Sequence, residues 1–205
     1  MKKVLVLLLI AVMLLGTLPA NAEEAVTIYA PGGRSAVVSS WDVPAYTSSG
    51  WFTYPVVYIF DSQANAYLIN AYELEYYVSK GYNLPVYVGD GVTIGGGNSY
   101  YTYYVNNWGA VTSITSFSAY YNVVNFSGKT ISVAPNTLKI NGVSFNGNIS
   151  GSVAPGNCKL FSLTVPGSTI YNSGIRKINK VDSSISFHDW DYSIAGTTAE
   201  VTYNS

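Results

Sequence analysis

Short runs of apolar and β-branched residues alternate with turn signals along the second half of the chain. The turn signals are pairs such as Asn141-Gly142 and Pro166-Gly167, in which glycine supplies positive φ angles and proline fixes φ. Roughly seven runs at this spacing are typical of a small antiparallel β-sandwich. We therefore predict a mainly β fold with an immunoglobulin-like antiparallel β-sandwich over residues 100–205. The expected strands are 101–105, 114–124, 132–140, 149–153, 159–165, 175–187 and 200–203.

The residues before this sandwich contain an internal repeat with an offset of 31 positions. The offset aligns Val26–Tyr29 with Val57–Phe60, Trp41 with Tyr72, Asp42 with Glu73, Gly50 with Gly81 and Trp51 with Tyr82. Each unit has the pattern of two strands, a short helix and a glycine where a left-handed residue ends the helix. We predict tandem ββα repeats at about 26–56 and 57–86, which form an α+β N-terminal part over residues 23–88.

A glycine-rich stretch separates the two parts. Residues 89–99 contain Gly89-Asp90-Gly91 and Gly95-Gly96-Gly97-Asn98, a composition typical of a flexible interdomain linker. The competing interpretation is a phosphate-binding loop, but the stretch lacks the Lys-Ser/Thr ending and a following helix. We therefore predict a linker over residues 89–99.

The N-terminus has the three parts of a secretory signal peptide. Lys2 and Lys3 precede an apolar run over residues 4–15, and Ala20-Asn21-Ala22 has the small residues that a signal peptidase requires. The alternative is a membrane anchor, which needs about 20 apolar residues to span a bilayer. Because this run is shorter, we expect a signal peptide over residues 1–22, no integral membrane segment after its cleavage, and a secreted, extracellular protein, free or held non-covalently at the cell surface.

The composition narrows the classes of partner. Only 10% of the residues are charged, whereas 15% are aromatic and 19 are tyrosine. The net charge of −1 and the lack of a basic patch argue against binding of nucleic acid. Cys158 is the sole cysteine, so an ordinary core rather than an intramolecular disulfide has to stabilise the fold. The oligomeric state stays open.

Two segments resemble parts of secreted modular proteins of Gram-positive bacteria. Residues 29–35, Tyr-Ala-Pro-Gly-Gly-Arg-Ser, and Gly50-Trp51 are similar to a short strand-turn-strand-helix repeat that reads roughly Tyr-Ala-Pro-Asp-Gly-Arg-Thr and ends in Gly-Trp-Tyr. Gly32 replaces the usual Asp, and the second unit lacks the Pro-x-Gly-Arg turn. The second half resembles an immunoglobulin-like accessory domain of such proteins, through residues 125–131, 153–156, 174–178 and 186–191. The resemblance implies an extracellular module of undefined function, and it carries over no catalytic residue.

Candidates for catalysis and metal binding are few. His188 lies next to Asp189 and near Asp191, and these residue types bind metal ions. On a strand, however, His188 and Asp189 point to opposite faces, so the competing interpretation is a polar strand end with solvated acids. No nucleophile motif is present, and nothing in the sequence nominates a catalytic pair among the 11 acidic residues. We expect no catalytic residue, no cofactor and no metal site beyond this weak candidate.

The tyrosines carry the best functional signal. Strand alternation places Tyr101 and Tyr103 on one face of their strand and Tyr100 and Tyr104 on the other, and Tyr76 and Tyr82 lie in the second repeat. Partly exposed aromatic residues are enriched at binding surfaces, although tyrosines also fill sandwich edges. We expect a non-enzymatic surface-interaction module that contacts cell wall, glycan or a partner protein. The alternatives are a carboxylate-dependent extracellular hydrolase and a structural spacer or subunit of a surface assembly.

Overall fold

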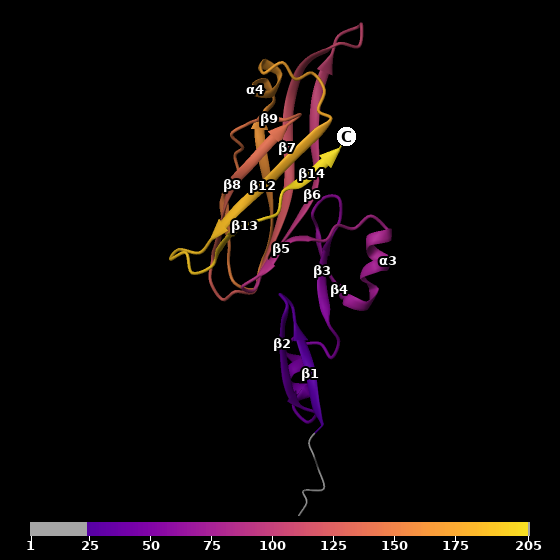
Figure 1. The fold of residues 1–205 in the computed structure, drawn as a ribbon, viewed down its shortest axis with the longest axis vertical. Helices are drawn as coiled ribbons and strands as arrows, with labels where there is room; N and C mark the ends of the chain where they lie inside the picture. The colour runs from indigo at the N-terminus through magenta and orange to yellow at the C-terminus, as the bar shows by residue number, and fades with distance from the viewer. Residues whose placement is uncertain (1–23, 205) are drawn as a thin grey trace, which may run out of the picture.

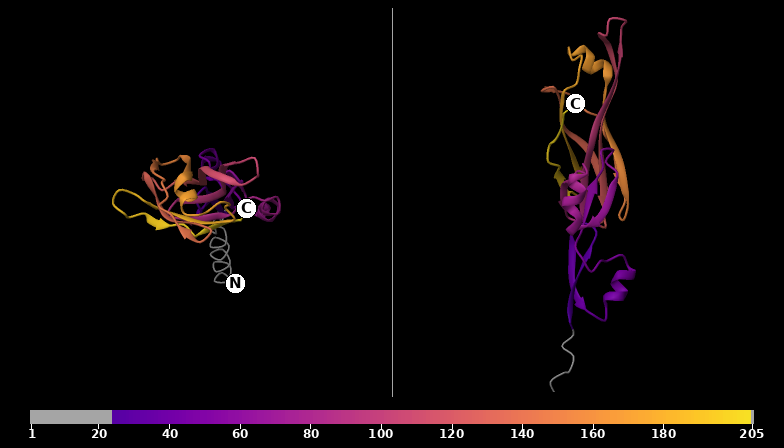
Figure 2. Two further views of the ribbon diagram at one scale, coloured as in Figure 1. Left: turned by 90° about the horizontal axis from the view of Figure 1, so that it is seen from above. Right: turned by 90° about the vertical axis from the view of Figure 1, so that its right-hand side faces the viewer.

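The computed structural model describes residues 24–204 and places them in an elongated, mainly β molecule (Figures 1 and 2). Two sheets with antiparallel strands form its C-terminal part, and two small hairpin units precede them along the chain. The signal peptide predicted for residues 1–22 lies outside the described residues. None of the helices between residues 24 and 204 has both the length and the apolar character that a membrane span requires.

The first sheet has the strand order β11-β7-β6-β5. Its central strands form one long antiparallel hairpin whose free end projects past the rest of the sandwich (Figure 1). Aromatic and β-branched residues are frequent in both central strands, which suits a pleated and half-buried surface. The bounds are β5 (Pro85–Gly89), β6 (Val92–Val105), β7 (Val111–Asn125) and β11 (Cys158–Pro166).

The second sheet is built on the antiparallel pair β8 and β12, whose register runs from Ile140 opposite Val181 to Ser132 opposite His188. Short strands flank this pair: β9 and β10 lie beside β8, and β13 and β14 lie beside β12. The bounds are β8 (Ile131–Ile140), β9 (Val143–Ser144), β10 (Gly151–Val153), β12 (Lys180–His188), β13 (Ala195–Thr197) and β14 (Val201–Asn204).

The core lies between the inward faces of the two sheets. Alternate residues of β7 from Phe117 to Val123 are buried, as the two-residue period of a strand requires. Ile131 and Ile185 meet them from the second sheet. The hydroxyl groups of Tyr121 and Ser183 lie 2.7 Å apart in a buried hydrogen bond, which joins the two sheets through the middle of the core.

Two local features differ from the sequence prediction. Residues 175–179, predicted to begin a strand, precede β12, and the predicted turn at Pro166-Gly167 opens the short helix α4 (Gly167–Asn172). A Cβ atom at Gly167 would overlap the backbone of Ile114, so glycine allows the helix to begin against β7. Ile170, within the helix, is also buried. A helix of this length is too short for its periodicity to be recognised.

Each of the two N-terminal hairpin units has two strands followed by a short helix. The first contains β1 (Ala25–Ala30), β2 (Arg34–Ser39) and α2 (Val43–Ser48). The second contains β3 (Val56–Phe60), β4 (Ala66–Asn70), the 3-10 helix η1 (Ala71–Glu73) and α3 (Leu74–Ser79). After each helix the chain returns to the first strand of its unit, through the bridges Tyr29–Phe52 and Phe60–Asn83.

The prediction of a linker over residues 89–99 is wrong. Asp90 and Gly91 form the turn between β5 and β6, and residues 92–97 are buried within β6. The sheet therefore begins at β5, and not at residue 100. The physical reason is close packing, because a Cβ at Gly95 would overlap the ring of Phe60 and one at Gly97 would lie 2.5 Å from the backbone nitrogen of Ala64. Glycine inside a strand here allows another part of the chain to approach.

Hydrogen bonds and ring contacts seat the second hairpin unit on the sandwich. Phe60 is fully buried over Gly95, and the backbone nitrogen of Asn98 donates to the carbonyl oxygen of Ser62 at 2.6 Å. Tyr58 stacks on Phe126, with ring centroids 6.2 Å apart. These contacts place the β3–β4 turn against the outer face of the first sheet.

Candidate functional site

The long hairpin of β6 and β7 is entirely uncharged. No Asp, Glu, Lys, Arg or His occurs between Asp90 and Lys129. The lower half of the hairpin, which begins at residues 92–97 of β6, is buried in the sandwich. The upper half, which ends in the turn between β6 and β7, projects beyond the sandwich (Figure 1) and has large exposed aromatic side chains. A continuous exposed apolar surface in a soluble domain marks an interaction site more often than scattered exposed residues do.

The four predicted tyrosines of β6 lie on this projecting half. Tyr101 and Tyr103 stack on each other, with centroids 5.5 Å apart, and Tyr101 also packs against the core. Tyr100 contacts Tyr120 of β7, with centroids 5.8 Å apart. Tyr104 is 66% exposed and lies near the end of the strand. The strand thus presents the phenol rings of Tyr100, Tyr103 and Tyr104 to solvent.

The tip of the hairpin carries Trp108, which the sequence interpretation did not single out. Its side chain is 92% exposed. The side-chain oxygen of Asn106 accepts hydrogen bonds from the backbone nitrogens of Trp108 (3.0 Å) and Ala110 (2.9 Å), so the turn is fixed from within. The available signal was the segment Asn106-Asn107-Trp108-Gly109 between two β runs, which is typical of a hairpin loop.

Tyr76 and Tyr82 belong to a separate aromatic group. Tyr82 makes edge-on contacts with Tyr77 and Tyr67, with centroids 5.5 Å and 5.6 Å apart, and Tyr76 contacts Tyr77. The ammonium group of Lys80 lies over the ring of Tyr76. These rings come from β4, from α3 and from the segment just after α3, and they pack on one another within the second hairpin unit. The structure therefore does not bring the six predicted tyrosines together into one site.

The residues of the weak metal candidate have other contacts. The side chain of Asp189 is fully buried, and its carboxylate accepts hydrogen bonds from the Ile194 nitrogen and the Ser193 hydroxyl and lies 2.9 Å from the Lys129 ammonium. His188 stacks on Tyr192. The interpretation of solvated acids is thus wrong for Asp189. Among residues 24–204, no three His, Cys, Asp or Glu side chains are grouped to hold a metal ion.

The electrostatics of Asp189 follow from these contacts. Burial on its own would raise the pKa of this carboxyl group, but the hydrogen bonds from Ile194, Lys129 and Ser193 outweigh it and hold the pKa well below its usual range. The hydrogen bonds from the Lys129 ammonium to the carboxylates of Asp189 and Asp191 raise the pKa of Lys129. Both groups stay charged at neutral pH, and their arrangement joins two loops.

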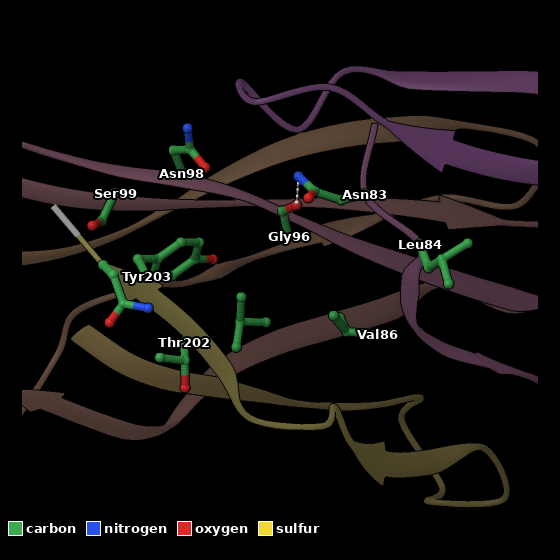
Figure 3. Close-up of a pocket in the computed structure, with 10 residues that line it drawn as sticks. Asn83, Leu84, Val86, Gly96, Asn98, Ser99, Thr202 and Tyr203 are labelled. Atoms are coloured by element: carbon green, nitrogen blue, oxygen red, sulfur yellow. Dashed lines mark hydrogen bonds between the residues drawn. The ribbon is translucent and has the colours of Figure 1, made fainter. Parts of the chain in front are cut away.

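A groove lies between β6 and β14 (Figure 3). It has a volume of about 520 Å³, and its lining includes Asn83, Asn98, Ser99, Thr202 and Tyr203. The side chain of Asn83 donates to the carbonyl oxygen of Gly96 across one wall. None of the predicted tyrosines lines this groove.

A second recess does include a predicted residue. It has a volume of about 350 Å³ and lies between the outer face of the first sheet and the β3–β4 turn. Its lining comprises Gln63, Asn65, Tyr100, Tyr120 and Leu160. Because Gln63 and Asn65 come from the second hairpin unit, the sequence could not place them beside Tyr100.

Comparison with known proteins adds little to these observations. No family model and no curated protein sequence matches the chain. The fold is similar to the crystal structure of a FixG-related protein from Vibrio parahaemolyticus at 9% sequence identity and a TM-score of 0.32, over 57% of this chain and 98% of that chain. A similarity of this strength supports no conclusion about function.

Proposed function

We propose that the chain is a secreted, non-enzymatic binding module that contacts cell wall, glycan or a partner protein through the β6–β7 hairpin. The observation that carries the proposal is the exposure of Trp108 at the tip of an uncharged hairpin. Trp and Tyr are the residues most enriched among interface hot spots. Because the Asn106 side chain fixes the turn, little conformational entropy has to be lost when the tip binds.

The modular organisation belongs to the same proposal. We infer that the two hairpin units are tandem ββα repeats and that the C-terminal sandwich is immunoglobulin-like, as in the secreted Gram-positive proteins that the sequence resembles. The shared order of two strands, a helix and a returning segment supports the repeat. The sequence of residues 1–22 supports export.

A structural spacer is the second candidate, and one observation favours it. The first hairpin unit and the hairpin tip lie at opposite ends of the elongated molecule (Figure 2). A spacer predicts self-association or incorporation into an assembly, which light scattering after size exclusion measures. The hydrolase alternative has less support, because the carboxylates of Asp189 and Asp191 share the ammonium group of Lys129 in ion pairs.

Retention of the purified protein on cell-wall peptidoglycan, on a glycan array and on immobilised surface proteins tests the binding function. We expect Trp108→Ala to weaken retention by at least about tenfold, the loss typical of a hot-spot residue. Trp190→Ala is the matched control, because Trp190 is also highly exposed but lies on the loop before β13. Equal retention of all three proteins, or no retention of the folded natural chain, would refute the role of the tip.

A further inference from the structure

The outer face of the first sheet is a platform of tyrosines and small hydroxyl residues. Strand alternation directs every second residue of β6, β7 and β11 to this face. It carries no charged side chain. Its members are Tyr100, Thr102 and Tyr104 from β6, Ser116, Ser118 and Tyr120 from β7, and Leu160, Ser162 and Thr164 from β11.

The recess at the lower end of this platform combines aromatic and amide groups. The rings of Tyr100 and Tyr120 meet at an interplanar angle of 60° and form one wall with Leu160. Gln63 and Asn65 from the β3–β4 turn complete the lining of the recess. Ligand sites are mostly apolar concave surfaces with a few placed polar groups, and this recess has that composition.

The β3–β4 turn holds the amide groups in place. One carboxylate oxygen of Asp61 accepts hydrogen bonds from the backbone nitrogens of Gln63 and Asn65, both at 2.8 Å. The other accepts from the Asn65 side-chain nitrogen at 2.8 Å, so the carbonyl oxygen of that amide is oriented. The Gln63 side chain makes no hydrogen bond within residues 24–204, and its donor and acceptor are therefore available to a ligand.

We propose that this recess binds a neutral oligosaccharide, with a sugar ring against Tyr100 and Tyr120. A sugar ring has an apolar face that packs on an aromatic ring and hydroxyl groups that pair with amides. An anionic ligand does not fit, because the recess has no cationic side chain and the Asp61 carboxylate lies beside it. The inference rests on the proposed binding function and deepens it by naming the ligand class and a second contact away from Trp108.

Calorimetric titration of the full chain with chitohexaose and with cellohexaose tests the inference. We expect binding of at least one of them, a loss of at least about tenfold in affinity for Tyr100→Ala, and a smaller loss for Gln63→Ala. Tyr76→Ala is the matched control, because Tyr76 is an exposed tyrosine outside the recess. This variant should bind the oligosaccharide with unchanged affinity. Polygalacturonate, which is anionic, should not bind. Circular dichroism of each variant establishes that it is folded.

The outcomes separate this inference from the proposed function. If neither neutral oligosaccharide binds while Trp108→Ala still abolishes retention on a wall or protein partner, the sugar site is wrong and the binding function stands. Binding that is equally sensitive to Tyr76→Ala and Tyr100→Ala, or preferred binding of polygalacturonate, also overturns the sugar site. If the folded chain binds no surface, protein or sugar, both proposals fail.

Discussion

At the scale of single residues, Asp189 shows how a buried carboxylate organises a loop. Three donors surround it, from Lys129, Ser193 and Ile194. The sequence placed it next to His188 and Asp191, but it could not show the partner from a loop 60 positions earlier, because an ion pair between distant segments leaves no local pattern. The ion pair joins a buried carboxylate to a partly exposed ammonium group, and its energy depends on both charges.

We predict that Asp189→Asn lowers the free energy of unfolding at neutral pH and has less effect in acid. The folded-state pKa lies below the ordinary value of about 3.9. The carboxylate therefore stabilises the fold above that value, and the contribution is lost as pH falls through the folded-state pKa. Urea unfolding of both proteins between about pH 7 and pH 3 measures the difference. Asp191→Asn, at a more exposed carboxylate, should cost less, and a difference that does not change with pH would contradict the prediction.

Tyr121 supplies the opposite pH dependence. Burial raises the pKa of Tyr121 to about 12, and the hydrogen bond with Ser183 lowers it only in part. Its protonated form therefore stabilises the fold below the ordinary value of about 10, and this contribution is lost as pH rises towards 12. We predict that Tyr121→Phe costs about 1 kcal/mol near neutral pH, since Ser183 loses its partner, and reduces the alkaline loss of stability. Urea unfolding curves near neutral pH and at alkaline pH measure the two free energies of unfolding. Tyr104→Phe, at an exposed position, should change neither the stability at neutral pH nor its alkaline loss.

At the scale of elements, the β6–β7 hairpin shows what strand periodicity reveals and what it misses. The runs at 101–105 and 114–124 lie within β6 and β7, because alternation on a half-buried strand is a local property. The sequence did not reveal the buried start of β6 at residues 92–97, because its glycines have no side chains that could show an alternation of apolar and polar positions. The helix α4 was missed because it is only six residues long, fewer than two turns.

The turn of this hairpin makes its own prediction. Asn106→Ala removes the acceptor of the bonds from the Trp108 and Ala110 nitrogens, so residues 107–109 should become mobile while the strands stay paired. Nitrogen-15 relaxation should show order parameters at the tip falling from about 0.85 towards 0.6 or lower. Asn107→Ala is the control, because the Asn107 side chain makes no hydrogen bond in the part of the chain that the structure describes. If both variants leave the tip rigid, the Asn106 side chain does not fix it, and the argument for a pre-organised Trp108 loses its basis.

At the scale of the whole molecule, the glycine-rich segment decides how the parts are arranged. Its composition is equally compatible with a flexible linker and with a strand that another part of the chain approaches closely. From the sequence alone we predicted the linker. The structure shows the closely packed strand, since Phe60 and Ala64 occupy the space that Cβ atoms at Gly95 and Gly97 would need. The recess beside Tyr100 depends on this contact, because Gln63 and Asn65 reach the first sheet only when the second unit is seated.

We predict that Gly95→Ala loosens the second hairpin unit from the sandwich. The added Cβ would overlap the ring of the fully buried Phe60, and overpacking of this kind costs about 1–3 kcal/mol. Amide hydrogen exchange should show faster exchange in β3, at residues Val56–Phe60, while β8 keeps its protection. The sugar affinity proposed for the recess should fall with it, although no residue that lines the recess has changed.

The double variant Gly95→Ala with Phe60→Leu distinguishes close packing from a general effect of alanine in the strand. A smaller side chain at position 60 leaves room for the new Cβ, so the second substitution should recover part of the lost stability. Residues in direct contact couple by about 0.5–3 kcal/mol. A coupling in this range would show that the loss of stability arises at the contact between Phe60 of the second hairpin unit and position 95 of β6. If Gly95→Ala is harmless in the natural background, close packing at Gly95 does not fix the position of the β3–β4 turn beside Tyr100.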